Sequence, residues 1–238
     1  MERVAPSLQE RTVDIHCHLL PGVDDGCDSI EEAFSILKKM AENGTRKVYL
    51  TPHLYSPRVK SCIGEVRDAF RRMQESYAGE YPELVLGSEV FLVPEIVELE
   101  FIPMGSTHFV LIELPADTRP RFLHHALRSL QEEGYVVILA HVERYRYLYT
   151  SKTSLVDLLT KRERFDEIIK LRNDGILFQV NWHSLINPGK HERPLVRYLL
   201  DSGFVDFVGS DKHSANDGRS LINYSHPYYA QTRNSELL

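Results

Sequence analysis

The chain has 238 residues, of which 42% are hydrophobic and 26% charged, the composition of an ordinary water-soluble globular protein. Its 28 Lys and Arg against 34 Asp and Glu give a net charge of −6 without a basic run, which argues against a nucleic-acid-binding module. The N-terminus is polar and the longest apolar stretch is 135–140, so we expect a cytoplasmic protein with no signal peptide and no membrane insertion.

Short apolar, β-branched runs alternate with longer amphipathic runs, the pattern of βα units around a parallel sheet. The predicted strands are 13–16, 47–51, 84–89, 109–113, 136–140, 176–181 and 204–209. One helix follows Ser29, which forms a capping-box pattern with Glu32, and stops at Asn43-Gly44. Further helices are predicted at 63–77, 121–133, 155–173 and 194–201. Seven alternations without a linker predict one closed α/β barrel, a single domain over 1–238, with a polar and loosely packed tail at about 223–238.

Ionisable side chains recur at the carboxyl ends of these strands, the edge that carries the active site in a β/α barrel. The charges in such a cluster repel one another, and burying them costs their hydration, unless cations pair with them. Nine candidate ligands exceed what one ion can use, so we expect two or three bridged ions. Imidazole and carboxylate ligands without a thiolate suit Mn, Fe or Zn, and many carboxylates favour Mn, Fe or Mg over a lone zinc. The candidates are His16, His18, Asp25, His53, Glu89, Glu113, His141, Asp211 and His213.

Basic residues lie close to two of these ligands. Arg144 follows His141 by three residues, and we expect its guanidinium to contact a phosphoryl group held over the metals. The alternative is an arginine at a helix start that pairs with Glu143. Lys212 and Arg219 flank the final ligands, and they either contact the same phosphoryl group or only balance the charge of the acidic cluster.

The three cysteines do not support thiol chemistry. Six residues after Cys17, Cys27 and Cys62, where a cysteine-dependent phosphatase needs an arginine, the chain has none. Cys17 lies between two candidate ligands, but on an extended segment its side chain points to the opposite side from both. We therefore expect buried packing for Cys17 and hydrolysis by water. Of the other histidines, only His183 follows a predicted strand closely enough to remain a candidate ligand.

As a set, these motifs resemble the polymerase and histidinol phosphatase (PHP) superfamily, and most closely its bacterial branch of manganese-dependent protein-tyrosine phosphatases of capsule and exopolysaccharide systems. The resemblance covers about 13–213 and implies a distorted seven-stranded, TIM-like barrel with a trinuclear centre. It rests on His16-Cys-His18, Asp25-Gly26, Thr51-Pro52-His53, Gly87-Ser88-Glu89, Ile112-Glu113, Ala140-His141-Val-Glu-Arg144-Tyr145 and Ser210-Asp211-Lys-His213.

Residue roles follow from the same resemblance. It implies one ion surrounded by His16, His18, Glu89 and Asp211, a second held by Glu89, Glu113 and His141, and a third held by Asp25, His53 and His213. Arg144 falls at the family's phosphate-binding arginine, so the catalytic set is Arg144, Glu89 and Asp211. After His213 the chain departs from the family pattern, and Ser214-Ala-Asn-Asp-Gly leads to Arg219, the second expected substrate-binding residue.

The resemblance implies a metal-dependent phosphomonoester hydrolase: a protein-tyrosine phosphatase acting on the tyrosine-rich tail of a bacterial kinase that controls capsule or exopolysaccharide synthesis. The expected cofactor is Mn²⁺, two or three ions, with Fe, Zn or Mg as alternatives. Water would attack phosphorus in line while Arg144 and the ions hold the non-bridging oxygens.

Two other functions stay open from the sequence. One is a small-molecule phosphatase of the same superfamily, acting on a substrate such as histidinol phosphate. A tyrosine phenolate, with a pKa of about 10, departs with little general-acid help, whereas an alkyl leaving group needs an acid. The other is a non-catalytic, metal-binding regulatory barrel. The oligomeric state also stays open.

Overall fold

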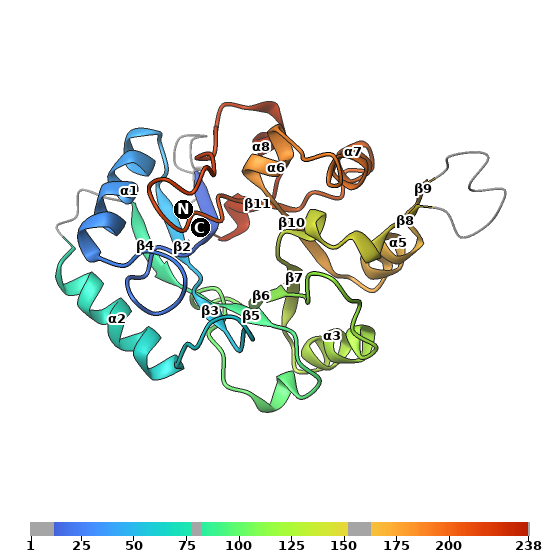
Figure 1. Cartoon of the computed structure of the whole chain (residues 1–238), viewed down its shortest axis with the longest axis horizontal. Helices are drawn as coiled ribbons and strands as arrows, with labels where there is room; N and C mark the ends of the chain where they lie inside the picture. The colour runs from blue at the N-terminus through green and yellow to red at the C-terminus, as the bar shows by residue number, and fades with distance from the viewer. Residues whose placement is uncertain (1–11, 78–81, 152–162, 238) are drawn as a thin grey trace, which may run out of the picture.

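The computed structural model describes residues 12–77, 82–151 and 163–237. Its inner layer is a curled sheet of parallel strands with helices around the outside (Figure 1). One part of the sheet has the order β1 (Val13–Cys17), β2 (Lys47–Leu50) and β4 (Glu83–Leu86). The other has the order β11 (Phe207–Gly209), β10 (Leu177–Asn181), β7 (Val136–Leu139), β6 (Phe109–Glu113), β5 (Glu89–Phe91) and β3 (His53–Leu54).

The two parts form one barrel because hydrogen bonding continues between them. Gly87 N donates to Leu50 O at 2.9 Å and Glu89 N to Pro52 O at 3.1 Å, so β3 and β5 extend β2 and β4 after a short break. On the other side, Asp211 N donates to His16 O at 2.8 Å, which joins the chain after β11 to β1. The predicted seven-stranded α/β barrel is therefore confirmed, with the predicted strand 84–89 divided at Gly87-Ser88.

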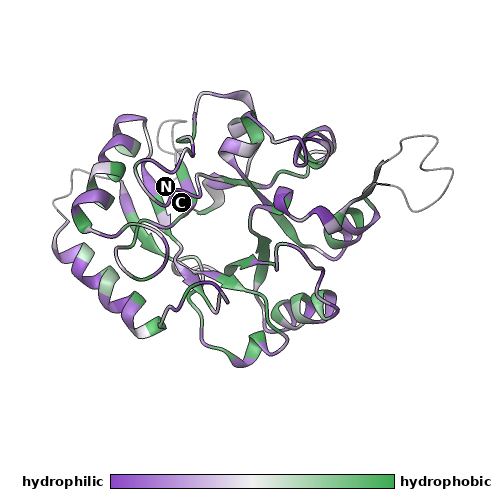
Figure 2. Cartoon of the chain, in the orientation of Figure 1, coloured by the Kyte–Doolittle hydropathy of each residue, from purple (hydrophilic) through white to green (hydrophobic). Residues whose placement is uncertain are grey.

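The outer helices are α1 (Ile30–Glu42), α2 (Ile63–Glu75), α3 (Leu123–Glu132), α5 (Asp166–Asn173) and α7 (Arg193–Asp201). Figure 2 shows hydrophobic residues concentrated in the strands, whereas the helices carry both hydrophobic and hydrophilic residues. Ser29 caps α1 as predicted, since its side chain accepts from Glu32 N at 3.2 Å. The Glu32 side chain does not complete the capping box, because its Oε1 accepts from Ala215 N at 3.0 Å. Of the predicted helix 155–173, residues 155–162 lie outside the described part of the chain.

Short elements that the sequence did not predict complete the structure. They are η2 (Ile96–Glu98), η3 (Val142–Arg144), η4 (Arg146–Leu148), β8 (Thr150–Ser151), β9 (Glu163–Arg164), α6 (Trp182–Ile186), α8 (Pro227–Ala230) and η5 (Asn234–Leu237). Within the described ranges, no helix combines the length and the apolar character needed to cross a bilayer.

The prediction of a loosely packed tail at 223–238 is wrong for its described residues. Val13 N donates to the Tyr229 hydroxyl at 2.9 Å, and Asn234 Nδ2 donates to Val13 O at 2.9 Å and Val208 O at 2.7 Å. Leu237 is fully buried among the side chains that fill the barrel, and its carbonyl accepts from the Tyr49 hydroxyl at 2.6 Å. The tail therefore closes the barrel end at which β1 begins, opposite the predicted ligands.

Candidate metal centre

Glu89 lies at the middle of the barrel mouth and is fully buried. Its Oε2 lies 3.2 Å from the Nε2 atoms of His16 and His18 and 3.1 Å from His53 Nδ1. Its Oε1 lies 2.7 Å from His141 Nε2. One carboxylate from β5 thus contacts imidazoles delivered by the ends of three other strands, β1, β3 and β7.

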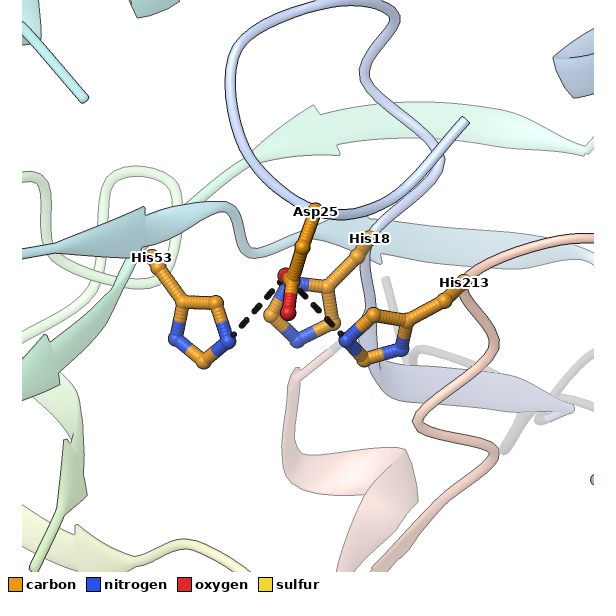
Figure 3. A group of neighbouring side chains, drawn as sticks. All are labelled: His18, Asp25, His53 and His213. Atoms are coloured by element: carbon orange, nitrogen blue, oxygen red, sulfur yellow. Dashed lines mark ion pairs between the residues drawn. The ribbon is translucent and has the colours of Figure 1, made fainter. Parts of the chain in front are cut away.

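A second group surrounds Asp25, on the loop after β1. Its Oδ1 lies 3.5 Å from both His53 Nε2 and His213 Nε2. Figure 3 shows Asp25 between these two imidazoles, with the His18 ring beside them. Ligand atoms of His18, Asp25, His53 and His213 all lie within 4.8 Å of one another, the spacing expected for donors that share an ion.

Glu113 and Asp211 also lie close to these imidazoles. Glu113 Oε2 lies 3.6 Å from His53 Nδ1, and Asp211 Oδ1 lies 3.6 Å from the Nε2 atoms of both His16 and His18. The structure therefore brings all nine predicted ligands to one mouth of the barrel. Three groups with metal-binding spacing share members: His18-Asp25-His53-His213, His16-His18-Glu89 and His53-Glu89-Glu113.

The unmatched polar atoms of this cluster fit divalent metal ions. Among the described residues, six buried side-chain atoms have no hydrogen-bond partner, and four of them are both Glu89 oxygens, His53 Nδ1 and Glu113 Oε2. Buried polar atoms are rarely left unpaired in folded proteins, because each costs on the order of 1–3 kcal/mol. Carboxylate oxygens and imidazole nitrogens that converge without donors between them are the ligands that such ions use.

The charges of the cluster also favour a bound cation. Burial raises the pKa of Glu89, but the imidazoles of His16, His53 and His141 outweigh it and hold this pKa well below its ordinary value. Burial and the neighbouring charge of Glu89 raise the pKa of Glu113, against the opposing Arg58. Two carboxylates so close together are both held ionised only when positive charge lies between them.

Residues behind the ligands fix their orientation. His18 Nδ1 lies 2.7 Å from Asp24 Oδ2, and His141 Nδ1 lies 3.1 Å from the Tyr145 hydroxyl, so in each ring Nε2 faces the cluster. Such partners set the tautomer and the ring plane of a metal-binding histidine. A Cβ at Gly26 would lie 1.9 Å from His18 O, so only glycine lets the loop fold back far enough for these contacts. The sequence interpretation assigned no role to Asp24 or Tyr145.

Two buried amides on β10 were also missed. Gln179 Oε1 accepts from His141 N at 2.7 Å and lies 3.1 Å from His16 Nδ1. Gln179 Nε2 donates to Asn181 Oδ1 at 2.9 Å, and Asn181 Nδ2 donates to Asp211 Oδ2 at 2.7 Å. β10 supplies none of the nine predicted ligands, yet it links three of them. Polar residues at alternate positions of an otherwise apolar strand were the available signal.

Backbone strain coincides with two ligands. Among the described residues other than glycine, only Tyr55, His141 and Asp211 have a positive φ, with values of 62°, 31° and 52°. Such conformations cost on the order of 1–3 kcal/mol and persist where the surrounding structure imposes them, which is typical of functional sites. The hydrogen bonds to His141 N and Asp211 N supply that constraint.

Arg144 reaches Asp211 rather than Glu143. Its Nη2 donates to Asp211 Oδ2 at 2.6 Å, while 37% of its side chain stays exposed. The alternative of a surface pair with Glu143 is wrong, since Glu143 is fully buried and its Oε1 accepts from Asn181 N at 3.1 Å. Arg219 Nε also lies 3.4 Å from Asp211 Oδ2, so both predicted substrate-binding arginines meet at this carboxylate.

The side chains of the remaining sequence candidates have other partners. Lys212 Nζ donates to Asp217 Oδ1 and to Arg219 O. Cys17 is fully buried as predicted, with Sγ donating to Tyr49 O at 3.3 Å, and burial raises its pKa well above the ordinary value. His183 pairs with the Ser220 hydroxyl at 3.1 Å and belongs to none of the three ligand groups.

Comparison with known proteins gives consistent matches. The sequence profile of the family described as "Capsular polysaccharide synthesis, CpsB/CapC" matches residues 12–234. The putative tyrosine-protein phosphatase CapC of Staphylococcus aureus is 29% identical over 211 residues, covering 85% of this chain and 77% of that protein. The tyrosine-protein phosphatase YwqE of Bacillus subtilis (strain 168) is 28% identical over 209 residues, with the same coverage.

One solved structure has a closely similar fold. It comes from a study of YwqE from Bacillus subtilis and CpsB from Streptococcus pneumoniae, described there as unique metal-dependent tyrosine phosphatases. It superposes with a TM-score of 0.75 at 23% identity, covering 92% of this chain and 86% of that one.

Proposed function

The chain belongs to the CpsB/CapC family of capsular polysaccharide synthesis, and we propose that it hydrolyses phosphotyrosine in proteins by metal-dependent chemistry at the centre around Glu89. The observation that carries this proposal is the environment of Glu89, a fully buried carboxylate whose two oxygens face four imidazoles. Relatives of similar sequence are named tyrosine-protein phosphatases, which supports the same substrate class.

We propose that the nine clustered side chains hold two or three ions in overlapping sets. The sets are His16, His18, Glu89 and Asp211; Glu89, Glu113 and His141 with His53 beside them; and Asp25, His53 and His213 with His18 beside them. Five imidazoles and four carboxylates suit Mn²⁺, and Fe, Zn and Mg are the alternatives. Bound ions would supply positive charge to phosphoryl oxygens and lower the pKa of water toward neutrality.

The chain's own residues would bind the phosphoryl group and orient it. Arg144 and Arg219 approach Asp211 from the mouth of the barrel, and Arg144 keeps more than a third of its side chain exposed. A guanidinium placed there has donors left for two phosphoryl oxygens, a contact that strengthens as charge develops in the transition state. Cys17 cannot serve as a nucleophile because its Sγ faces Tyr49 O in the core, so we assign the attack to water.

The proposed physiological substrate is the phosphorylated, tyrosine-rich tail of a kinase that controls capsule or exopolysaccharide synthesis. The capsule-related family supports this assignment, as does the 37% exposure of the Arg144 side chain at the mouth of the barrel. All nine predicted ligand positions carry an ionisable side chain, which supports catalysis over a purely regulatory barrel.

A comparison of substrates tests the proposal. Metal-free and Mn-reconstituted protein would each be assayed with a phosphotyrosyl peptide and with histidinol phosphate. We expect hydrolysis of the peptide by reconstituted protein only, with histidinol phosphate a poor substrate. Preference for histidinol phosphate would reassign the protein as a small-molecule phosphatase, and no hydrolysis of either by metal-loaded protein would favour the regulatory barrel.

A further inference from the structure

A pocket of about 330 Å³ opens beside the metal centre, between the loop that follows β3 and the loop that follows β6. The residues that line it include Pro57, Phe91 and Pro115, together with Arg58 and Asp117. The volume is at the lower end of the range for small-ligand sites. The pocket is therefore large enough for one ring-bearing side chain.

Two residues connect this pocket to the proposed metal ligands. Arg58 lines it and donates from Nη2 to Glu113 Oε1 at 2.7 Å. Phe91 pairs in register with Glu113 across β5 and β6 and follows Glu89 by two positions. Because side chains two apart in a strand share a face, Phe91 lies on the same side as Glu89 and one step farther out along β5. A group bound at Glu89 thus has the pocket next to it.

The lining has the chemistry of an aromatic subsite. Half-buried Phe91 offers a ring for offset or edge-to-face contact, and the two prolines add flat apolar surface. The Arg58 side chain is 65% exposed, and a guanidinium so placed can lie over an aromatic face. The Pro115 carbonyl accepts a hydrogen bond from the Tyr147 hydroxyl at 2.7 Å, which fixes the position of Pro115 in the lining of the pocket.

We propose that this pocket receives the phenyl ring of phosphotyrosine while the phosphoryl group lies at the metal centre, and that Phe91 is a specificity-determining residue. The inference rests on the proposed function and deepens it, because it explains how the site distinguishes phosphotyrosine from alkyl phosphates. Serine and threonine phosphates carry no ring to fill the pocket and would lose its contacts.

Steady-state kinetics of the full, Mn-loaded chain test the subsite. Phe91→Ala should raise KM about tenfold for a phosphotyrosyl peptide and for phenyl phosphate, the effect of losing one aromatic contact. Inhibition by inorganic phosphate, which has no ring, should change less than twofold, and metal content should not change. Phe91→Tyr keeps a ring and should retain a KM close to wild type.

The matched control is Tyr228→Ala, which removes a half-buried aromatic residue from a separate pocket beside α7. It should leave both KM values and the inhibition constant of phosphate unchanged. An unaltered KM in Phe91→Ala would contradict the proposed ring subsite. So would a rise in the inhibition constant of phosphate as large as the rise in KM.

Failure of the proposed function has a different signature. If wild type hydrolyses neither ring-bearing substrate, the phosphatase assignment is wrong. Calorimetric measurement of ligand binding then tests the ring subsite independently of catalysis. Tighter binding of phenyl phosphate than of inorganic phosphate, lost in Phe91→Ala, would support the pocket as a ring site. Equal affinity for the two would contradict it.

Discussion

Arg144 and Asp211 come together from strand ends 67 positions apart, with Arg144 Nη2 donating to Asp211 Oδ2 at 2.6 Å. The same oxygen accepts from Asn181 Nδ2 at 2.7 Å. Burial opposes ionisation of Asp211, but Arg144 and the surrounding imidazoles hold its pKa well below the ordinary value. The arginine is thus fixed beside the proposed ligands without being one of them.

Arg144→Ala separates phosphoryl binding from metal binding. Metal content and fold should persist, because Asn181 still holds Asp211. The rate should fall about 30- to 1000-fold, or about 2–4 kcal/mol, through lost transition-state stabilisation. Arg144→Lys should recover only part of this, since a point charge cannot reproduce a bidentate fork. Kinetics and elemental analysis would be compared with Arg146→Ala, an exposed neighbour. Wild-type turnover in Arg144→Ala would remove this residue from the site.

Glu89→Ala removes the carboxylate that faces four imidazoles. Both metal content and hydrolysis should fall strongly, because among the described residues no other carboxylate lies close to all four rings. Elemental analysis and activity assays on the same preparation would measure this. Full metal content in a folded Glu89→Ala protein would contradict a bridging role.

Cys17→Ser tests the assignment of the nucleophile. Its Sγ hydrogen-bonds to Tyr49 O in the core, and a hydroxyl can make the same bond. Hydrolysis should therefore stay close to wild type. A folded, metal-loaded Cys17→Ser protein without activity would show that the thiol takes part in the reaction.

The sequence predicted which side chains gather at the barrel mouth because all of them but Asp25, which lies on the loop after β1, stand at or next to a strand end, where the local pattern itself marks the position. Gln179 and Asn181 were missed because their amides are not ionisable, and only the assembled barrel shows that both reach neighbouring ligands. The packing of the tail could not be predicted either. It depends on Asn234, whose amide pairs with Val13 and Val208, residues distant in sequence.

Gln179→Leu tests the role of the β10 amides. The change removes the acceptor for His141 N and the partner of His16 Nδ1. Metal affinity should fall about 10- to 100-fold, as for other residues that orient metal-binding histidines. Competition with a chelator would measure it, with Gln131→Leu on α3 as the matched control. If Gln179→Leu binds metal as tightly as wild type, the amide only stabilises the fold.

Asp217 gives a prediction for acid stability. Burial opposes its ionisation, but the Lys212 ammonium and the backbone N–H groups of His213, Arg219 and Ser214 lower its pKa from 3.8 to about 2. A carboxyl with a lowered folded pKa stabilises the fold above its unfolded pKa, and the contribution disappears as the pH falls through the folded pKa. The stability difference between wild type and Asp217→Asn should therefore shrink from pH 4 to pH 2. Chemical denaturation at several pH values would show it, and Asp68→Asn, at an exposed site on α2, should show no such trend.

The central claim is that hydrolysis requires a metal centre with more than one ion. The most direct measurement is elemental analysis of purified, active protein, with activity followed as the metal is removed by chelation and restored with Mn²⁺. We expect two or three divalent ions per chain, loss of activity on chelation and recovery with Mn²⁺. Active protein with no more than one ion per chain would contradict the account.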